Sequence, residues 1–139
     1  MQATITWRDG VKFEGESGSG HRILMDGAPE AGGENAGARP MELVLIGTGG
    51  CTSYDVVHIL RKGRQDIRGC VAHISAERAE TDPKVFTKIH FHFVISGKDL
   101  KPDQVKRAID LSAEKYCSAS IMLAKTADIT HDFELVEVA

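Results

Sequence analysis

Two of the three cysteines stand in contexts that suit thiol chemistry. Cys51 follows Gly49-Gly50 inside a long apolar segment, and Cys117 lies where two helices are expected to meet, before a candidate helix cap at Ser118. A thiol close to the amides of a helix N-terminus has a lowered pKa and a higher reactivity, and Cys51 would share this advantage if the glycines break its helix. The alternative is that both cysteines are small buried apolar residues, which is the interpretation favoured for Cys70.

Three histidines offer a second kind of site. His90 and His92 are two apart in one expected strand, so their side chains share a face about 7 Å apart. They could hold a metal ion together with His73 from the neighbouring strand. Imidazoles on the solvent face of a sheet need no such role, and our preferred interpretation includes no metal and no cofactor.

Other catalytic patterns are weak or missing. Asp55 and His58 follow Cys51 at helical spacing, but the first and last of these residues cannot easily point at each other on a helix. We therefore expect Asp55 and His58 to make packing or local polar contacts. The chain has no Cys-x-x-Cys, His-Glu-x-x-His, phosphate-binding loop or Gly-x-Gly-x-x-Gly, which weighs against a thioredoxin motif, a zincin, an NTPase and a dinucleotide binder.

Cys51 must be positioned by the segment that contains it. Pro40 suits the first turn of a helix, and Arg61, Lys62 and Gly63 suit its end, so residues 40–62 are expected to form one long helix. Its first half is apolar all round, which predicts burial on every side. Its glycines predict either a close approach to the backbone by another element or a ligand, or a break in the helix.

The N-terminus alternates apolar and polar residues, which indicates a hairpin. A three-residue loop that ends at Gly10 would place Trp7 opposite Val11 and keep one face apolar, whereas a two-residue loop would place Trp7 opposite Lys12. We therefore expect the longer loop, with Gly10 in a left-handed conformation.

The rest of the chain predicts further strands and helices. Strands that cluster rather than alternate strictly with helices indicate an α+β fold with an antiparallel sheet packed on the long helix, in a single domain over residues 1–139. After the hairpin the expected elements are a strand at 21–25, a loop at 26–39, the long helix, a strand pair at 66–78 and 85–95, helices from Pro102 and Ser118, and a strand from about Ile129 to Val138.

Size and charge limit the function classes. The chain has 139 residues, a net charge of −3 and a pI near 6.1, which argues against a nucleic-acid or anionic-membrane partner. The longest apolar run is Leu43 to Ile46, and the first residues are neither basic nor apolar, so we expect no spanning helix, no secretory signal and a cytoplasmic protein. Three cysteines are too few for a disulfide scaffold. A helix apolar on all sides in so short a chain also predicts a dimer.

Three motifs together resemble the OsmC/Ohr family, the osmotically inducible proteins C and organic hydroperoxide resistance proteins. They are Pro40-Met41-Glu42-Leu43, Gly49-Gly50-Cys51 and Glu114-Lys115-Tyr116-Cys117-Ser118. The resemblance covers nearly the whole chain and is strongest to the short OsmC-like proteins of the YhfA-type subgroup. The cysteine contexts at a separation of 66 residues are its most specific part.

The resemblance implies an intertwined α+β homodimer and a thiol peroxidase for organic hydroperoxides. Carried onto matching positions, Cys51 would be the thiolate that is oxidised to a sulfenic acid, and Cys117 the thiol that closes a disulfide with it. A lipoyl-type dithiol would restore both thiols by exchange.

Two positions depart from the family pattern. The characterised peroxidases carry Glu directly after the helix-opening proline, where this chain has Met41, with Glu42 one position later. They also use an arginine beside the thiolate, for which Arg39 and Arg22 are the candidates here. These departures keep open an alternative, a catalytically weak or inactive dimer of the same fold that binds an apolar small ligand at its interface.

Overall fold

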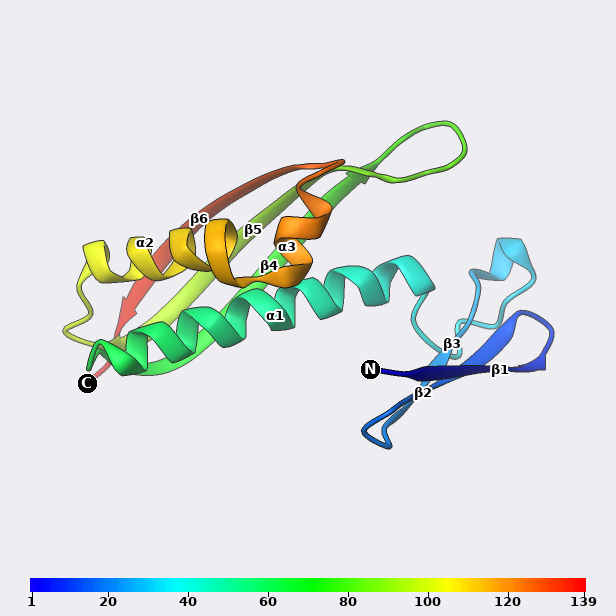
Figure 1. The fold of residues 1–139 in the computed structure, drawn as a ribbon, viewed down its shortest axis with the longest axis horizontal. Coiled ribbons are helices and arrows are strands. Elements are labelled where there is room, and N and C mark those ends of the chain that lie inside the picture. The colour runs from blue at the N-terminus through cyan, green and yellow to red at the C-terminus, as the bar shows by residue number, and fades with distance from the viewer. The chain divides into compact units, whose positions relative to one another are not determined.

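The computed structural model describes residues 1–139, and it divides into two compact units, Met1–Ile46 and Gly47–Ala139 (Figure 1). Each unit has its own three-stranded sheet, and the two are described separately below. The long helix α1 begins in the first unit and continues into the second. In chain order the elements are β1 (Ala3–Asp9), β2 (Lys12–Ser17), β3 (Arg22–Met25), the 3-10 turn η1 (Pro29–Ala31), α1 (Pro40–Lys62), β4 (Asp66–Arg78), β5 (Phe86–Lys98), α2 (Pro102–Leu111), the π turn η2 (Ser112–Tyr116), α3 (Ser118–Leu123) and β6 (Asp128–Glu137).

The first unit carries the antiparallel sheet β1-β2-β3, and its hairpin register corrects the sequence prediction. Trp7 pairs with Phe13 rather than with Val11, and Asp9 pairs with Lys12. A register shift between Trp7 and Asp9 absorbs one residue, so the apolar face is preserved with a shorter loop. Gly10 has a φ of +50°, as expected for a left-handed loop residue.

The loop that follows β3 is anchored by one buried carboxylate. The side chain of Asp26 accepts hydrogen bonds from the backbone N–H groups of Gly27, Glu34 and Ala36, at 2.8, 2.9 and 3.1 Å. These bonds outweigh the opposing effect of burial and hold the pKa of Asp26 below its usual value. The glycine-rich segment therefore has a defined path.

The second unit is built on the sheet β4-β5-β6, with β5 in the centre. β4 pairs with β5 in antiparallel fashion, as predicted, but β6 pairs with β5 in parallel, so the expectation of a purely antiparallel sheet is wrong. The helical segments between β5 and β6 carry the chain back along the sheet, so β6 starts from the same end as β5. The α+β class itself is confirmed.

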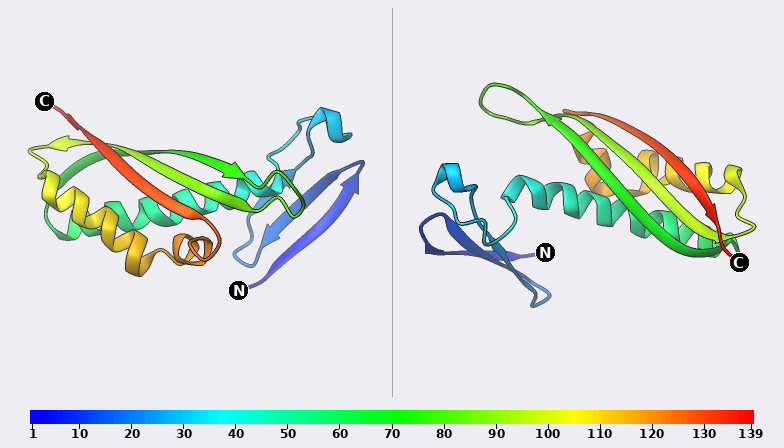
Figure 2. Two further views of the ribbon diagram at one scale, coloured as in Figure 1. Left: turned by 90° about the horizontal axis from the view of Figure 1, so that it is seen from above. Right: turned by 180° about the vertical axis from the view of Figure 1, so that it is seen from behind.

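The core of the second unit is a row of side chains on β5. Ile89, Phe91, Phe93 and Ile95 are each at most 1% exposed, while the histidines between them face the other side of the sheet. In Figure 2 the helices of this unit lie along one face of the sheet. The expected helix from Pro102 is α2, and its buried side chains are Val105, Ala108 and Ile109.

α1 is continuous over the predicted range, so the glycines do not break it. Gly49 is buried, and a Cβ built on it would lie 2.5 Å from Cδ1 of Ile74 on β4, which identifies the close approach that this glycine permits. By length and composition α1 is also apolar enough to cross a membrane, contrary to our expectation. One such helix is weak evidence, because a core helix passes the same test.

The β5 row should dominate the stability of the second unit. Phe91→Ala removes a fully buried ring from its centre and should lower the free energy of unfolding by about 3–5 kcal/mol. Val71→Ala on β4 is the matched control, because Val71 is 51% exposed and its truncation should change stability by less than about 0.5 kcal/mol. Urea unfolding of the three proteins measures both values. Equal losses would show that the row is not the core.

Candidate functional site

The second unit brings Cys51 on α1 close to Cys117 at the start of α3, so that each thiol affects the pKa of the other. Cys117 is fully buried, whereas Cys51 is partly exposed. The next residue on α1, Thr52, donates from Oγ1 to Sγ of Cys117 at 3.3 Å, and its oxygen lies 3.1 Å from Oγ of Ser120. Both hydroxyl-bearing residues are buried. The two cysteines predicted to carry thiol chemistry thus lie beside the same buried polar side chains.

The two thiols have opposite electrostatic settings. Burial raises the pKa of Cys51, and its hydrogen bond to Cys117 raises it further, against a smaller opposing effect of the Ala119 amide. Burial also acts to raise the pKa of Cys117, but hydrogen bonds from Cys51, Ser120 and Thr52 outweigh it and lower the pKa below 9.0. The advantage that Cys51 would gain from a break in its helix does not arise, because α1 is continuous.

Local geometry explains the environment of Cys117. A π turn at Ser112–Tyr116 ends α2, and the backbone then becomes extended at Cys117 before α3 begins. Cys117 itself is the N-cap, since its sulfur accepts the N–H of Ser120 at 3.3 Å. The predicted cap, Ser118, is instead the first residue of α3. Thr52 and Ser120 were not identified from the sequence. The available signal was their position, since Thr52 directly follows Cys51 and Ser120 lies three residues after Cys117.

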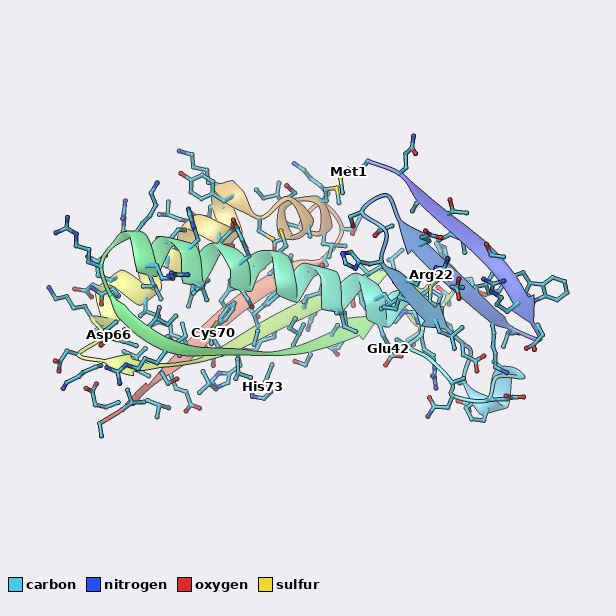
Figure 3. The ribbon with its side chains drawn as sticks, turned by 90° about the horizontal axis from the view of Figure 1, so that it is seen from below. Met1, Arg22, Glu42, Asp66, Cys70 and His73 are labelled. Carbon is cyan, nitrogen blue, oxygen red and sulfur yellow. The ribbon has the colours of Figure 1, made fainter.

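The remaining polar residues near Cys51 make local contacts, as predicted. Asp55 accepts a hydrogen bond from Ser112 at 2.9 Å, and the ring of His58 stacks on Tyr54 at 5.9 Å between centroids. Cys70 on β4, labelled in Figure 3, is half-buried, and burial raises its pKa.

The candidate acid and arginines lie in the first unit, where each has a local partner. Glu42 accepts the backbone N–H of Arg39 at 2.8 Å, which caps the start of α1. The Arg39 guanidinium donates to Asn35 at 2.7 Å and to the Gly37 carbonyl at 3.1 Å. Arg22 on β3 is 3.7 Å from a carboxylate oxygen of Glu16 on the neighbouring strand.

The histidines of β5 bind a carboxylate on β6. His90 and His92 contact the same oxygen of Asp132, at 3.0 and 2.7 Å, and the rings of His73 and His92 stack at 6.3 Å. No group of three or more His, Cys, Asp or Glu side chains in the chain could hold a metal ion, so the metal-site hypothesis finds no support. The cluster is an ion-pairing network on the open face of the sheet.

Comparison with known proteins assigns the chain to a family. A family model described as OsmC-like protein matches residues 32–132. Protein YhfA of Escherichia coli strain K12 is 52% identical over 98% of both chains. A solved structure titled "structural genomics" is 49% identical, with a TM-score of 0.91 over 99% of this chain and 100% of the other.

The chain therefore belongs to the OsmC-like family, and the resemblance predicted from its motifs is confirmed. The fold extends to distant members. A Legionella pneumophila structure described as an organic hydroperoxide resistance protein OsmC has a TM-score of 0.71 at 16% identity, over 96% of this chain and 95% of the other.

Removing the carboxylate between the two histidines should change stability in a pH-dependent way. The Asp132 hydrogen bond raises the pKa of His92 above 6.5, and the His92 hydrogen bond lowers the pKa of Asp132 below 3.8. The His92 contribution is complete below pH 6.5 and disappears as the pH rises through its folded pKa. The Asp132 contribution is complete above pH 3.8 and disappears as the pH falls through its folded pKa. Asp132→Asn should therefore lower the Tm most between about pH 4 and 6.5.

The matched control is Asp128→Asn on the same strand, which removes a carboxylate that contacts neither histidine. Thermal unfolding of both variants and the parent from pH 4 to 9 measures the effect. A Tm loss for Asp132→Asn that is the same at every pH would contradict the ion-pair assignment.

Proposed function

We propose that the chain is a thiol-dependent peroxidase that reduces organic hydroperoxides through a disulfide between Cys51 and Cys117. The observation that carries the proposal is the close approach of these two thiols from distant parts of the sequence, with Thr52, the residue after Cys51, bonded directly to the sulfur of Cys117. Membership of the OsmC-like family supports a peroxide-related redox role, and the described hydroperoxide resistance function of a protein with the same fold supports the substrate class.

The proposed reaction uses both sulfurs in turn. The Cys51 thiolate attacks the O–O bond of the hydroperoxide, which releases an alkoxide that is protonated to the alcohol and leaves a sulfenic acid on Cys51. The Cys117 sulfur then attacks the sulfenic sulfur, hydroxide leaves and becomes water, and the disulfide forms. A dithiol of the lipoyl type reopens the disulfide by exchange and is itself oxidised to a disulfide. Partial exposure of Cys51 and full burial of Cys117 make Cys51 the sulfur that meets the substrate.

We also propose that the protein acts as a cytoplasmic homodimer in which the two units form one domain. The sheet of the first unit leaves one apolar face largely open, where Ile5 is 57%, Trp7 64% and Ile23 47% exposed. An uncovered apolar face of this kind indicates an interaction surface. We further propose that residues of the partner subunit complete the site, and that Glu42 and Arg39 take part in catalysis.

A second candidate is a catalytically inactive dimer that binds an apolar small ligand. It is favoured by the local hydrogen bonds of the two candidate residues: Glu42 accepts the backbone N–H of Arg39, and the Arg39 guanidinium donates to the Gly37 carbonyl. It is also favoured by an apolar hollow of about 460 Å³ on the first unit, lined by Ile5, Ile23, Met25 and Leu43 among others. Unreactive Cys51 near neutral pH in a thiol titration would favour this candidate over the peroxidase.

The peroxidase proposal predicts a defined covalent product. One equivalent of cumene hydroperoxide should convert the reduced protein to a form two hydrogens lighter, with the new disulfide mapped to Cys51 and Cys117 by peptide mass. Cys51→Ser should abolish peroxide consumption, and Cys117→Ser should trap a sulfenic acid on Cys51 because no second thiol condenses with it. Cys70→Ser is the control and should retain the reaction. The proposal fails if the reduced protein with a dithiol consumes no hydroperoxide.

The dimer proposal predicts a face-specific effect of charge. Ile5→Lys places an ammonium group on the open apolar face and should convert the dimer to a monomer at micromolar concentration in light scattering. Thr6→Lys adds the same charge on the opposite face of β1 and should leave the dimer intact. A monomeric parent protein would contradict the proposal directly.

A further inference from the structure

The hydroxyl groups around Cys117 form a chain that ends on its sulfur. Thr52 has one hydroxyl proton, which points to Cys117 in the 3.3 Å contact, so the 3.1 Å contact with Ser120 is made by the Ser120 hydroxyl donating to Thr52. The amide N–H of Ser120 adds a second direct donor to the same sulfur, also at 3.3 Å. The nearby Cys51 thiol also acts to lower the pKa of Cys117.

This arrangement suits an anion on Cys117. Sulfur is a weak acceptor when it is a neutral thiol, and hydrogen bonds become about twice as strong when the acceptor is charged. Thr52 and Ser120 are both at most 1% exposed, so no water competes for their hydroxyl groups. Asp55, which faces the pair from α1, disfavours charge on Cys51.

We propose that Thr52 and Ser120 are positioning residues that keep Cys117 as the deprotonated member of the cysteine pair, and that Cys117 is the base that activates Cys51. The second part rests on the proposed peroxidase function. The first part concerns the reduced protein alone and holds whether or not a peroxide is consumed.

The proton balance of the reaction follows. The resting pair holds one proton, on Cys51, and transfer of this proton to the Cys117 thiolate leaves Cys51 as the attacking thiolate. After the O–O bond breaks, the Cys117 thiol gives the proton to the departing alkoxide and becomes a thiolate again. It then attacks the Cys51 sulfenic acid, hydroxide leaves, and one solvent proton converts that hydroxide to water.

The same arrangement sets the direction of disulfide reduction. An external thiolate should attack the sulfur of Cys51, because Cys117 is fully buried, and the bond should break with Cys117 leaving as its stabilised thiolate. The mixed disulfide with the reductant should therefore form on Cys51.

The test follows thiolate formation through absorbance near 240 nm as a function of pH, in reduced protein carrying Cys70→Ser. The first thiol should titrate below the ordinary value of 9.0. Thr52→Val should raise this titration by about one pH unit, a tenfold change in acid constant, because it removes a hydrogen bond to the anion. Ser120→Ala should raise it by less, because the Ser120 hydroxyl acts through Thr52 and the N–H at position 120 still donates to the sulfur. Thr52→Ser keeps the hydroxyl and should restore the parent titration.

Two further sets of variants identify the thiol and control for general effects. Cys51→Ser should retain a titration below 9.0, whereas Cys117→Ser should leave only the higher titration of Cys51. Ser53→Ala removes a hydroxyl group from the residue after Thr52 on α1, whose side chain interacts with Cys70 rather than with Cys117, and should have no effect. A low titration that survives Cys117→Ser, or one that Thr52→Val leaves unchanged, would overturn the proposal.

A separate measurement checks the role in exchange without any peroxide. Protein oxidised with diamide is reduced by excess glutathione, and the trapped mixed disulfide should map to Cys51. Reduction should be about threefold slower in Thr52→Val, because a Brønsted slope of about 0.5 converts one pKa unit of the leaving thiol into about half a log unit of rate. Glutathione mapped to Cys117 would contradict the leaving-group assignment. If titration and exchange behave as expected but no hydroperoxide is consumed, the thiolate assignment stands and the peroxidase function fails.

Discussion

The burial of one row of apolar side chains on β5 is the constraint on which the second unit depends. Phe91 and Phe93 are fully buried on the face of the sheet that carries the helices. Gly49 allows α1 to approach β4 closely at Ile74, closer than any residue with a Cβ could without a shift. This packing holds the α1 turn that carries Cys51 and Thr52 against the start of α3. The contact between the two thiols is therefore a consequence of how the core closes.

The chemistry of the cysteine pair depends on unequal environments within one site. Burial alone would raise the pKa of both thiols, and it does so for Cys51. At Cys117 the hydrogen-bond donors outweigh burial, so the pKa of Cys117 is lowered while that of Cys51 is raised. A pair arranged in this way keeps one proton available for transfer. The exposure of the two sulfurs also differs. The sulfur of Cys117 is buried among its hydrogen-bond donors, whereas the sulfur of Cys51 is accessible to a reactant.

Patterns of local chemistry predicted most of the fold. Pro40 and Gly63 bounded α1 correctly, and period two identified the strands and the buried face of β5. The errors came from interactions between segments. A bulge near Trp7 changed the register of the hairpin. The parallel pairing of β6 depends on the path of the helices before it, which the alternation of residues in a strand does not reveal. The contexts of Cys51 and Cys117 were visible as motifs, but the roles of Thr52 and Ser120 were not.

The sequence by itself determined the elements, the α+β class, the family and the two cysteines that carry the proposed reaction, because each of these follows from local periodicity, caps and motifs. Only the tertiary structure decided which thiol is stabilised as an anion. That outcome depends on hydrogen bonds between residues 65 and 68 positions apart, Thr52 with Cys117 and Thr52 with Ser120. The sequence left open a helix break at the glycines that would favour Cys51, but the helix is continuous, as its expected range implied. The donors gather at Cys117 because packing against the core brings α1 and α3 together.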